Sequence, residues 1–124
     1  MKKLFLPYEL AAIAKEKGFK EPCMAYTYTG DTALNKDIFV LPSNKIEDHN
    51  VDSLSVSHPL YAQIIDWFRE EHKIHIEVNY MDDVLLYNFK LTLLDINEER
   101  EGINWKLSYY DALEAAIEEA FKII

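Results

Sequence analysis

The sequence predicts a single α+β domain, residues 1–124, in which amphipathic helices pack on a mainly antiparallel sheet. Three observations predict this class. Apolar residues recur at helical spacing in three segments, they alternate in several others, and polar turns separate neighbouring alternating segments. The expected order is α-β-β-α-β-β-β-α. A chain of 124 residues suits one domain, because single domains cluster at about 100–150 residues.

Three helices are expected, and residues typical of helix ends mark two of them. The first runs from about Pro7, which suits an initial helical turn, to Lys17, with Gly18 as the left-handed residue that ends it. In the last helix, Ser108 and Asp111 resemble a capping box. The second helix spans about 59–72, with Ser57 or His58 as its cap, and its apolar stripe is Leu60, Ile64, Trp67 and Phe68.

Five strands are expected from alternating apolar residues or short apolar runs. They cover a pair within 22–41, then 74–80, 84–94 and 103–107. The polar stretch 42–57 is predicted to be a flexible loop, and 95–102 a charged connector. Both faces of strand 84–94 carry apolar residues, which predicts a homodimer through the second face of the sheet or its edge.

The net charge of −9 limits the classes of partner. Residues 66–124 hold fourteen acidic residues against six basic ones, a balance of −8. Because nucleic acids and anionic membranes attract Lys and Arg, we expect no direct nucleic-acid or membrane partner. No apolar run is long enough to span a bilayer, Pro7 interrupts the apolar start, and Cys23 is the one cysteine, so a cytoplasmic location is expected.

Several segments together resemble a known group of proteins. They are Gly18–Cys23 (GFKEPC), Gln63–His72 (QIIDWFREEH) leading into Ile74–Val78 (IHIEV), and Tyr109–Ala120 (YYDALEAAIEEA). In these segments the chain is similar to small uncharacterised proteins encoded by bacterial phages, prophages and mobile elements. The resemblance implies a phage or mobile-element setting. It brings no catalytic residue, cofactor or mechanism with it.

Common sequence motifs of enzymes are absent or incomplete. The glycines are too widely separated for a phosphate-binding loop, and no GxSxG motif is present. Cys23 is interpreted as a small buried residue rather than a nucleophile. His72 and His75, with neighbouring glutamates, form the nearest approach to a metal site and define an alternative function, a small metal-dependent enzyme. No catalytic, cofactor or metal residue is assigned.

The remaining signal is a surplus of aromatic residues, with eight tyrosines and two tryptophans. Tyrosine is enriched at protein interfaces, because its ring covers a large area at a small entropic cost. Tyr26, Tyr28, Tyr109 and Tyr110 are therefore the predicted interaction surface. The sequence favours a non-enzymatic protein that binds a protein partner or itself, and a second alternative is an acidic inhibitor of a host nucleic-acid-binding protein.

Overall fold

A computed structural model describes residues 4–29, 38–41 and 46–124 of the chain. It confirms the α+β class, the antiparallel strands and the order of the predicted elements, with one further strand before the second helix. Within the described residues the strands form two three-stranded sheets, where one sheet was expected. The chain divides into two compact units, Met1–Ile64 and Ile65–Ile124, which are described in turn.

The first unit begins with α1 (Tyr8–Glu16), whose two ends lie where the sequence predicts them. Pro7 is the N-cap in extended conformation, and Gly18 adopts a φ of 91°. The Gly18 N–H donates to the Lys15 carbonyl at 3.1 Å, and the Phe19 N–H donates to the Ala14 carbonyl at 2.9 Å. This pair of hydrogen bonds is a Schellman motif, which requires a left-handed residue at the position of Gly18.

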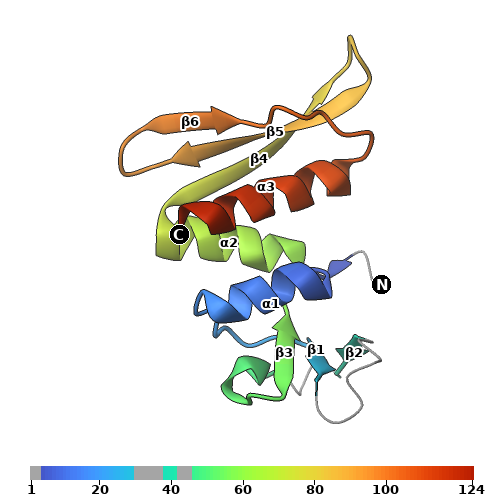
Figure 1. Cartoon of the computed structure of the whole chain (residues 1–124), viewed down its shortest axis with the longest axis vertical. Coiled ribbons are helices and arrows are strands. Elements are labelled where there is room, and N and C mark those ends of the chain that lie inside the picture. Colours follow the sequence, from blue (N-terminus) through green and yellow to red (C-terminus); the bar gives the residue numbers. More distant parts are fainter. Residues whose placement is uncertain (1–3, 30–37, 42–45) are drawn as a thin grey trace. The chain divides into compact units, whose positions relative to one another are not determined.

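The sheet of the first unit has the order β2-β1-β3 (Figure 1). The central strand β1 (Ala25–Tyr28) pairs antiparallel with β2 (Phe39–Val40) and with β3 (Ser55–His58), and α1 packs on β3. The strand β3 and a short 3₁₀ helix, η3 (His49–Val51), occupy part of the predicted loop, whose residues 42–45 lie outside the described residues.

The predicted cap of the second helix is wrong, since Ser57 and His58 are buried residues of β3. The helix itself, α2 (Tyr61–His72), is confirmed and continues from the first unit into the second. Ile64, Trp67 and Phe68 of its predicted stripe are buried. Periodicity therefore located this helix correctly, although the residues before it extend as a strand.

The sheet of the second unit has the order β4-β5-β6 and is covered on one face by α3 (Figure 1). Strand β4 (Ile74–Met81) forms a hairpin with β5 (Leu86–Leu93), and β5 pairs with β6 (Glu98–Glu101). Helix α3 (Tyr109–Ile123) packs on β4 and β5. Its buried stripe is Ala112, Leu113, Ala116, Ile117, Ala120 and Phe121.

The position of the last strand differs from the prediction. The charged segment Glu98–Glu101, expected as a connector, pairs with β5, whereas residues 103–107 contribute only an isolated bridge between Lys106 and Tyr87. A tight turn at 94–97, with Asn97 at a φ of 51°, places Glu98 opposite Leu93. The turn fixes the register, so the charged residues pair first.

The second face of this sheet is mostly polar, although Leu86 of β5 lies on it opposite Met81. Val84 and Leu94 lie in turns outside β5, and the Lys90 ammonium stands 3.8 Å from the carboxylates of Glu77 and Glu99. Residues paired on that face include His75 with Thr92 and Glu77 with Lys90. The predicted homodimer, through this face or an edge of the sheet, stays a prediction.

Candidate protein interface

Four tyrosines of the second unit form a continuous row of ring contacts, which we call the tyrosine row: Tyr80, Tyr87, Tyr109 and Tyr110. The Tyr80 and Tyr87 ring centroids are 5.0 Å apart, and those of Tyr87 and Tyr109 are 6.2 Å apart. Tyr109 and Tyr110 follow at 5.4 Å. The last two ring pairs are nearly perpendicular, at 86° and 89°. The row thus runs from β4 across β5 to the first turn of α3.

Backbone pairing and helix capping hold the row in place. Tyr80 and Tyr87 are directly opposite each other in the β4–β5 hairpin, so their rings lie on one face of the sheet. Tyr109 and Tyr110 directly follow Ser108, the N-cap of α3, whose hydroxyl accepts a hydrogen bond from the Asp111 N–H at 3.0 Å. The predicted cap at Ser108 is confirmed, and it fixes where these two rings leave the helix.

An exposed apolar segment leads into the row. After β6, the Gly102 N–H donates to the Phe89 carbonyl at 3.0 Å, and pairing with β5 resumes only at Lys106, opposite Tyr87. Four residues, 102–105, thus face two on β5, as in an enlarged β-bulge. Around this bulge Ile103 is 92% exposed and Leu107 is 83% exposed, with Trp105 also exposed. The bulge thus leaves exposed the apolar side chains whose alternation predicted a strand at 103–107.

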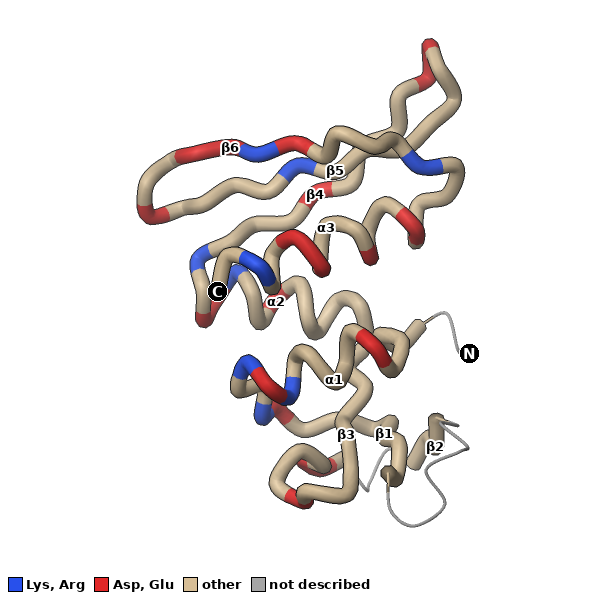
Figure 2. Tube along the Cα trace, in the orientation of Figure 1, with Lys and Arg blue, Asp and Glu red and all other residues tan. Residues whose placement is uncertain are grey.

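Acidic residues flank the row. Asp82 and Asp83 are exposed in the β4–β5 turn, and Asp111 is exposed in the first turn of α3. No described lysine or arginine forms an ion pair with these three carboxylates. Figure 2 shows acidic residues at the tip of the β4–β5 hairpin and along α3. Lys106 is opposite Tyr87, so the three aspartates outnumber this one lysine, and the balance of charge beside the row favours a cationic partner.

The other predicted pair, Tyr26 and Tyr28, lies in the first unit. Tyr28 is 44% exposed, equal to Tyr109, whereas Tyr26 is half-buried and stacks on His49 with ring centroids 4.5 Å apart. Ala25 and Thr27, the small residues on either side of Tyr26, face the interior. Tyr26 thus has a packing role, and this pair makes a smaller exposed aromatic surface than the tyrosine row.

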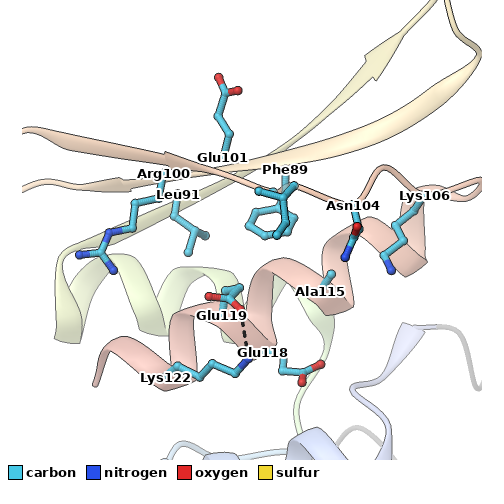
Figure 3. A pocket seen from close by; sticks show the side chains of 12 residues that line it. Phe89, Leu91, Arg100, Glu101, Asn104, Lys106, Ala115, Glu118, Glu119 and Lys122 are labelled. Carbon is cyan, nitrogen blue, oxygen red and sulfur yellow. Dashed lines mark hydrogen bonds and ion pairs between the residues drawn. The ribbon is translucent and has the colours of Figure 1, made fainter.

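A groove of about 280 Å³ lies in the second unit between β6 and α3 (Figure 3). Phe89, Leu91 and Ala115 give it apolar walls, and Figure 3 shows Glu101 pointing away from it. Along α3 the Lys122 ammonium is 3.1 Å from the Glu119 carboxylate. Cations and carboxylates both line the groove, so its charges favour neither an anionic nor a cationic ligand.

The structure does not bring the two histidines of the alternative function together as metal ligands. His72 packs edge-on against Trp67 at 4.6 Å, and burial lowers the pKa of His72. His75 lies on the polar sheet face, with its Nε2 3.5 Å from a Glu77 carboxylate oxygen. Within residues 4–29, 38–41 and 46–124, no three His, Cys, Asp or Glu side chains converge in an arrangement suited to a metal ion.

A buried polar cluster in the first unit was missed from sequence. The His58 Nδ1–H donates to the Leu6 carbonyl at 2.7 Å, so the Nε2 of the neutral ring accepts from the Thr27 hydroxyl at 2.7 Å. The His49 N–H donates to the Ser57 hydroxyl at 2.9 Å. Burial lowers the pKa of His58. These bonds satisfy the polar groups of the sheet interior, which is a structural role.

Cys23 borders this cluster and matches its interpretation as a buried residue. It is buried, and its Sγ lies 3.7 Å from the Gln63 Oε1. Burial raises the pKa of Cys23 to about 12. Because the thiolate is the nucleophilic form, this cysteine is held in its unreactive thiol form at neutral pH.

Comparisons with known proteins identify no relative: no family model, no curated protein and no solved structure matches the chain. Across the described part of the chain, none of the helices combines the length and apolar character needed to cross a membrane. The tyrosine row thus rests on the geometry of this chain alone. Its Tyr109 and Tyr110 were predicted, while Tyr80 and Tyr87 were assigned to alternating strands without a surface role.

Proposed function

We propose that this chain is a non-enzymatic protein-binding domain whose second unit holds a partner protein on the tyrosine row. The observation that carries the proposal is the continuous contact of four tyrosine rings beside the exposed segment 103–107. Contiguous exposed apolar and aromatic surface usually marks an interaction site. Aromatic residues also contribute much of the energy of protein interfaces, because they bury large areas with few rotatable bonds.

The charge of the second unit supports a partner that is basic. Fourteen acidic residues against six basic ones give residues 66–124 a balance of −8. A complementary positive surface would associate faster and in a defined orientation. An acidic inhibitor of a host nucleic-acid-binding protein is one member of this class. The phage or mobile-element setting, which the sequence resemblance implies, stays a prediction.

The proposal can be tested by mapping the interface with a photo-crosslinking amino acid at position 109. The partner joined to it, in extract of the cells that produce the chain, is then purified and its dissociation constant measured directly. Tyr109→Ala should raise that constant at least about tenfold, as expected of a central interface residue. Tyr28→Ala is the matched control, since both side chains are 44% exposed.

Two results would contradict the proposal. If Tyr28→Ala weakens binding and Tyr109→Ala does not, the interface lies on the first unit. Light scattering at micromolar concentration could give twice the chain mass of 14.5 kDa. If Tyr109→Ala then returns the mass to that of a single chain, the row is covered by a second copy of the chain. This second result would show a homodimer through the face of the sheet that carries the row.

A further inference from the structure

The hydroxyl groups of the tyrosine row point to the chemistry of the partner. Among the described residues, none hydrogen-bonds to the hydroxyls of Tyr80, Tyr87 or Tyr109. A tyrosine hydroxyl that becomes buried at an interface usually acquires a hydrogen-bond partner. The partner should therefore present several unpaired acceptors along its length. Backbone carbonyls of an extended segment without internal hydrogen bonds meet this requirement.

The direction of the row distinguishes between kinds of extended segment. A strand added to the sheet would run along β4 or β6, because main-chain pairing follows a sheet edge. The row instead crosses from β4 to β5 and on to α3. An amphipathic helix would need a continuous apolar groove, whereas the four side chains of this row each carry a polar hydroxyl. A polyproline II segment needs neither an edge nor a groove of that kind.

The ring geometry matches such a segment. The rings of Tyr87, Tyr109 and Tyr110 alternate between nearly perpendicular orientations, so faces and edges follow one another along the row. Pyrrolidine rings pack against aromatic faces, and polyproline II loses little conformational entropy on binding. The carboxylates of Asp82, Asp83 and Asp111, which form no ion pair with a described lysine or arginine, would attract flanking cations.

We propose that the tyrosine row binds a proline-rich segment of the partner in polyproline II conformation, flanked by arginine or lysine. This inference rests on the proposed function and names the kind of partner. It assigns the rings to contact with proline, the hydroxyls of Tyr80, Tyr87 and Tyr109 to the carbonyls of the segment, and the three aspartates to its cations.

Labelled synthetic peptides test the inference by fluorescence anisotropy with the full chain. A peptide of repeating Arg-Pro-Pro triplets should bind saturably. Peptides of Arg-Gly-Gly and of Glu-Pro-Pro triplets should each bind at least about tenfold more weakly, since one lacks the polyproline II conformation and the other the cations. Arg-Gly-Gly binding as tightly as Arg-Pro-Pro would overturn the inference, because charge alone would then explain the attraction.

Variants locate the peptide on the surface. Tyr109→Ala should weaken Arg-Pro-Pro binding at least about tenfold, Tyr109→Phe by a smaller factor because it keeps the ring, and Tyr28→Ala not at all. Asp83→Asn should also weaken Arg-Pro-Pro binding. Its loss of affinity relative to the unchanged chain should grow as the salt concentration is lowered. Circular dichroism melts confirm that each variant is folded. Equal losses in Tyr28→Ala and Tyr109→Ala would overturn the assignment.

Failure of this inference and failure of the proposed function give different results. If no peptide binds, but the purified partner still depends on Tyr109, the row binds a protein by another mode and only the inference is wrong. If neither the peptides nor a purified partner depend on Tyr109, both proposals are wrong.

Discussion

Replacing Phe121 by alanine tests the packing that supports the tyrosine row. Phe121 is 3% exposed on the buried stripe of α3, and its ring centroid lies 5.0 Å from that of Phe68 in α2. Removing a buried phenylalanine side chain costs about 3–5 kcal/mol, since transfer energy is lost and a cavity remains. About 0.5–1.5 kcal/mol of this belongs to the aromatic pair. We therefore expect Phe121→Ala to lower the free energy of unfolding by about 4 kcal/mol.

Urea melts followed by tryptophan fluorescence measure this loss in the correct unit. Both tryptophans, Trp67 and Trp105, belong to the second unit. Glu118→Ala is the control, because Glu118 is exposed on the same helix, and its effect should stay within about 0.5 kcal/mol. In the double variant with Phe68→Ala, the two losses should fall short of additivity by about 0.5–1.5 kcal/mol.

The reasoning would be refuted if Phe121→Ala differed from the unchanged chain by less than about 1 kcal/mol, the size of a surface effect. Full additivity with Phe68→Ala would refute the ring contact alone. A large loss in Glu118→Ala would show that the fluorescence change reports something other than the packing of α3.

Three further changes have defined outcomes in urea melts. Ser108→Ala should cost about 1 kcal/mol, because the Asp111 N–H loses its acceptor; no loss would mean that the cap is replaced by solvent. Gly102→Ala should cost about 1–3 kcal/mol, since the new Cβ would lie 2.6 Å from Asn88 Oδ1 and from a Phe89 ring carbon; an unchanged midpoint would contradict this. Burial lowers the pKa of His58 below 6.5, so the unfolded chain takes up a proton that the folded chain does not. Stability should be full above pH 6.5 and fall as the pH drops toward the folded-state pKa, by up to about 1.4 kcal/mol per pH unit for this group. His58→Gln should reduce this dependence of stability on pH. His72, whose pKa is also lowered, is present in both proteins and contributes equally to each. An unchanged pH dependence would refute the assignment to His58.

The helices were predictable because their signals are local. Gly18 and Ser108 mark helix ends through hydrogen bonds to residues three to five positions away, and a stripe of apolar side chains marks each buried face. These signals do not depend on which strand lies beneath the helix. The class and order of elements follow from them, because a short connection between two alternating segments favours antiparallel pairing.

Strand β3 could not be predicted for the opposite reason. Its residues Ser55, Val56, Ser57 and His58 are mostly polar, yet all four are buried. The His58 ring is satisfied by the Leu6 carbonyl and the Thr27 hydroxyl, which lie 52 and 31 positions away. A polar stretch is typical of a loop unless such distant partners are known. Tertiary hydrogen bonding, rather than local pattern, determines this strand.

Tyr109 and Tyr110 of the candidate site were predictable from sequence. The exposure of the neighbouring segment 103–107 was not, because it follows from the register of the β5–β6 hairpin. Alternation of Ile103, Trp105 and Leu107 predicted a strand, but the turn at 94–97 gives the pairing positions on β5 to Glu98–Glu101. Leaving Ile103 and Leu107 exposed forgoes about 1.5–3 kcal/mol of burial for each. A partner that covers this segment together with the tyrosine row would recover that energy on binding, which is why an unfavourable feature of the isolated chain supports a role in recognition.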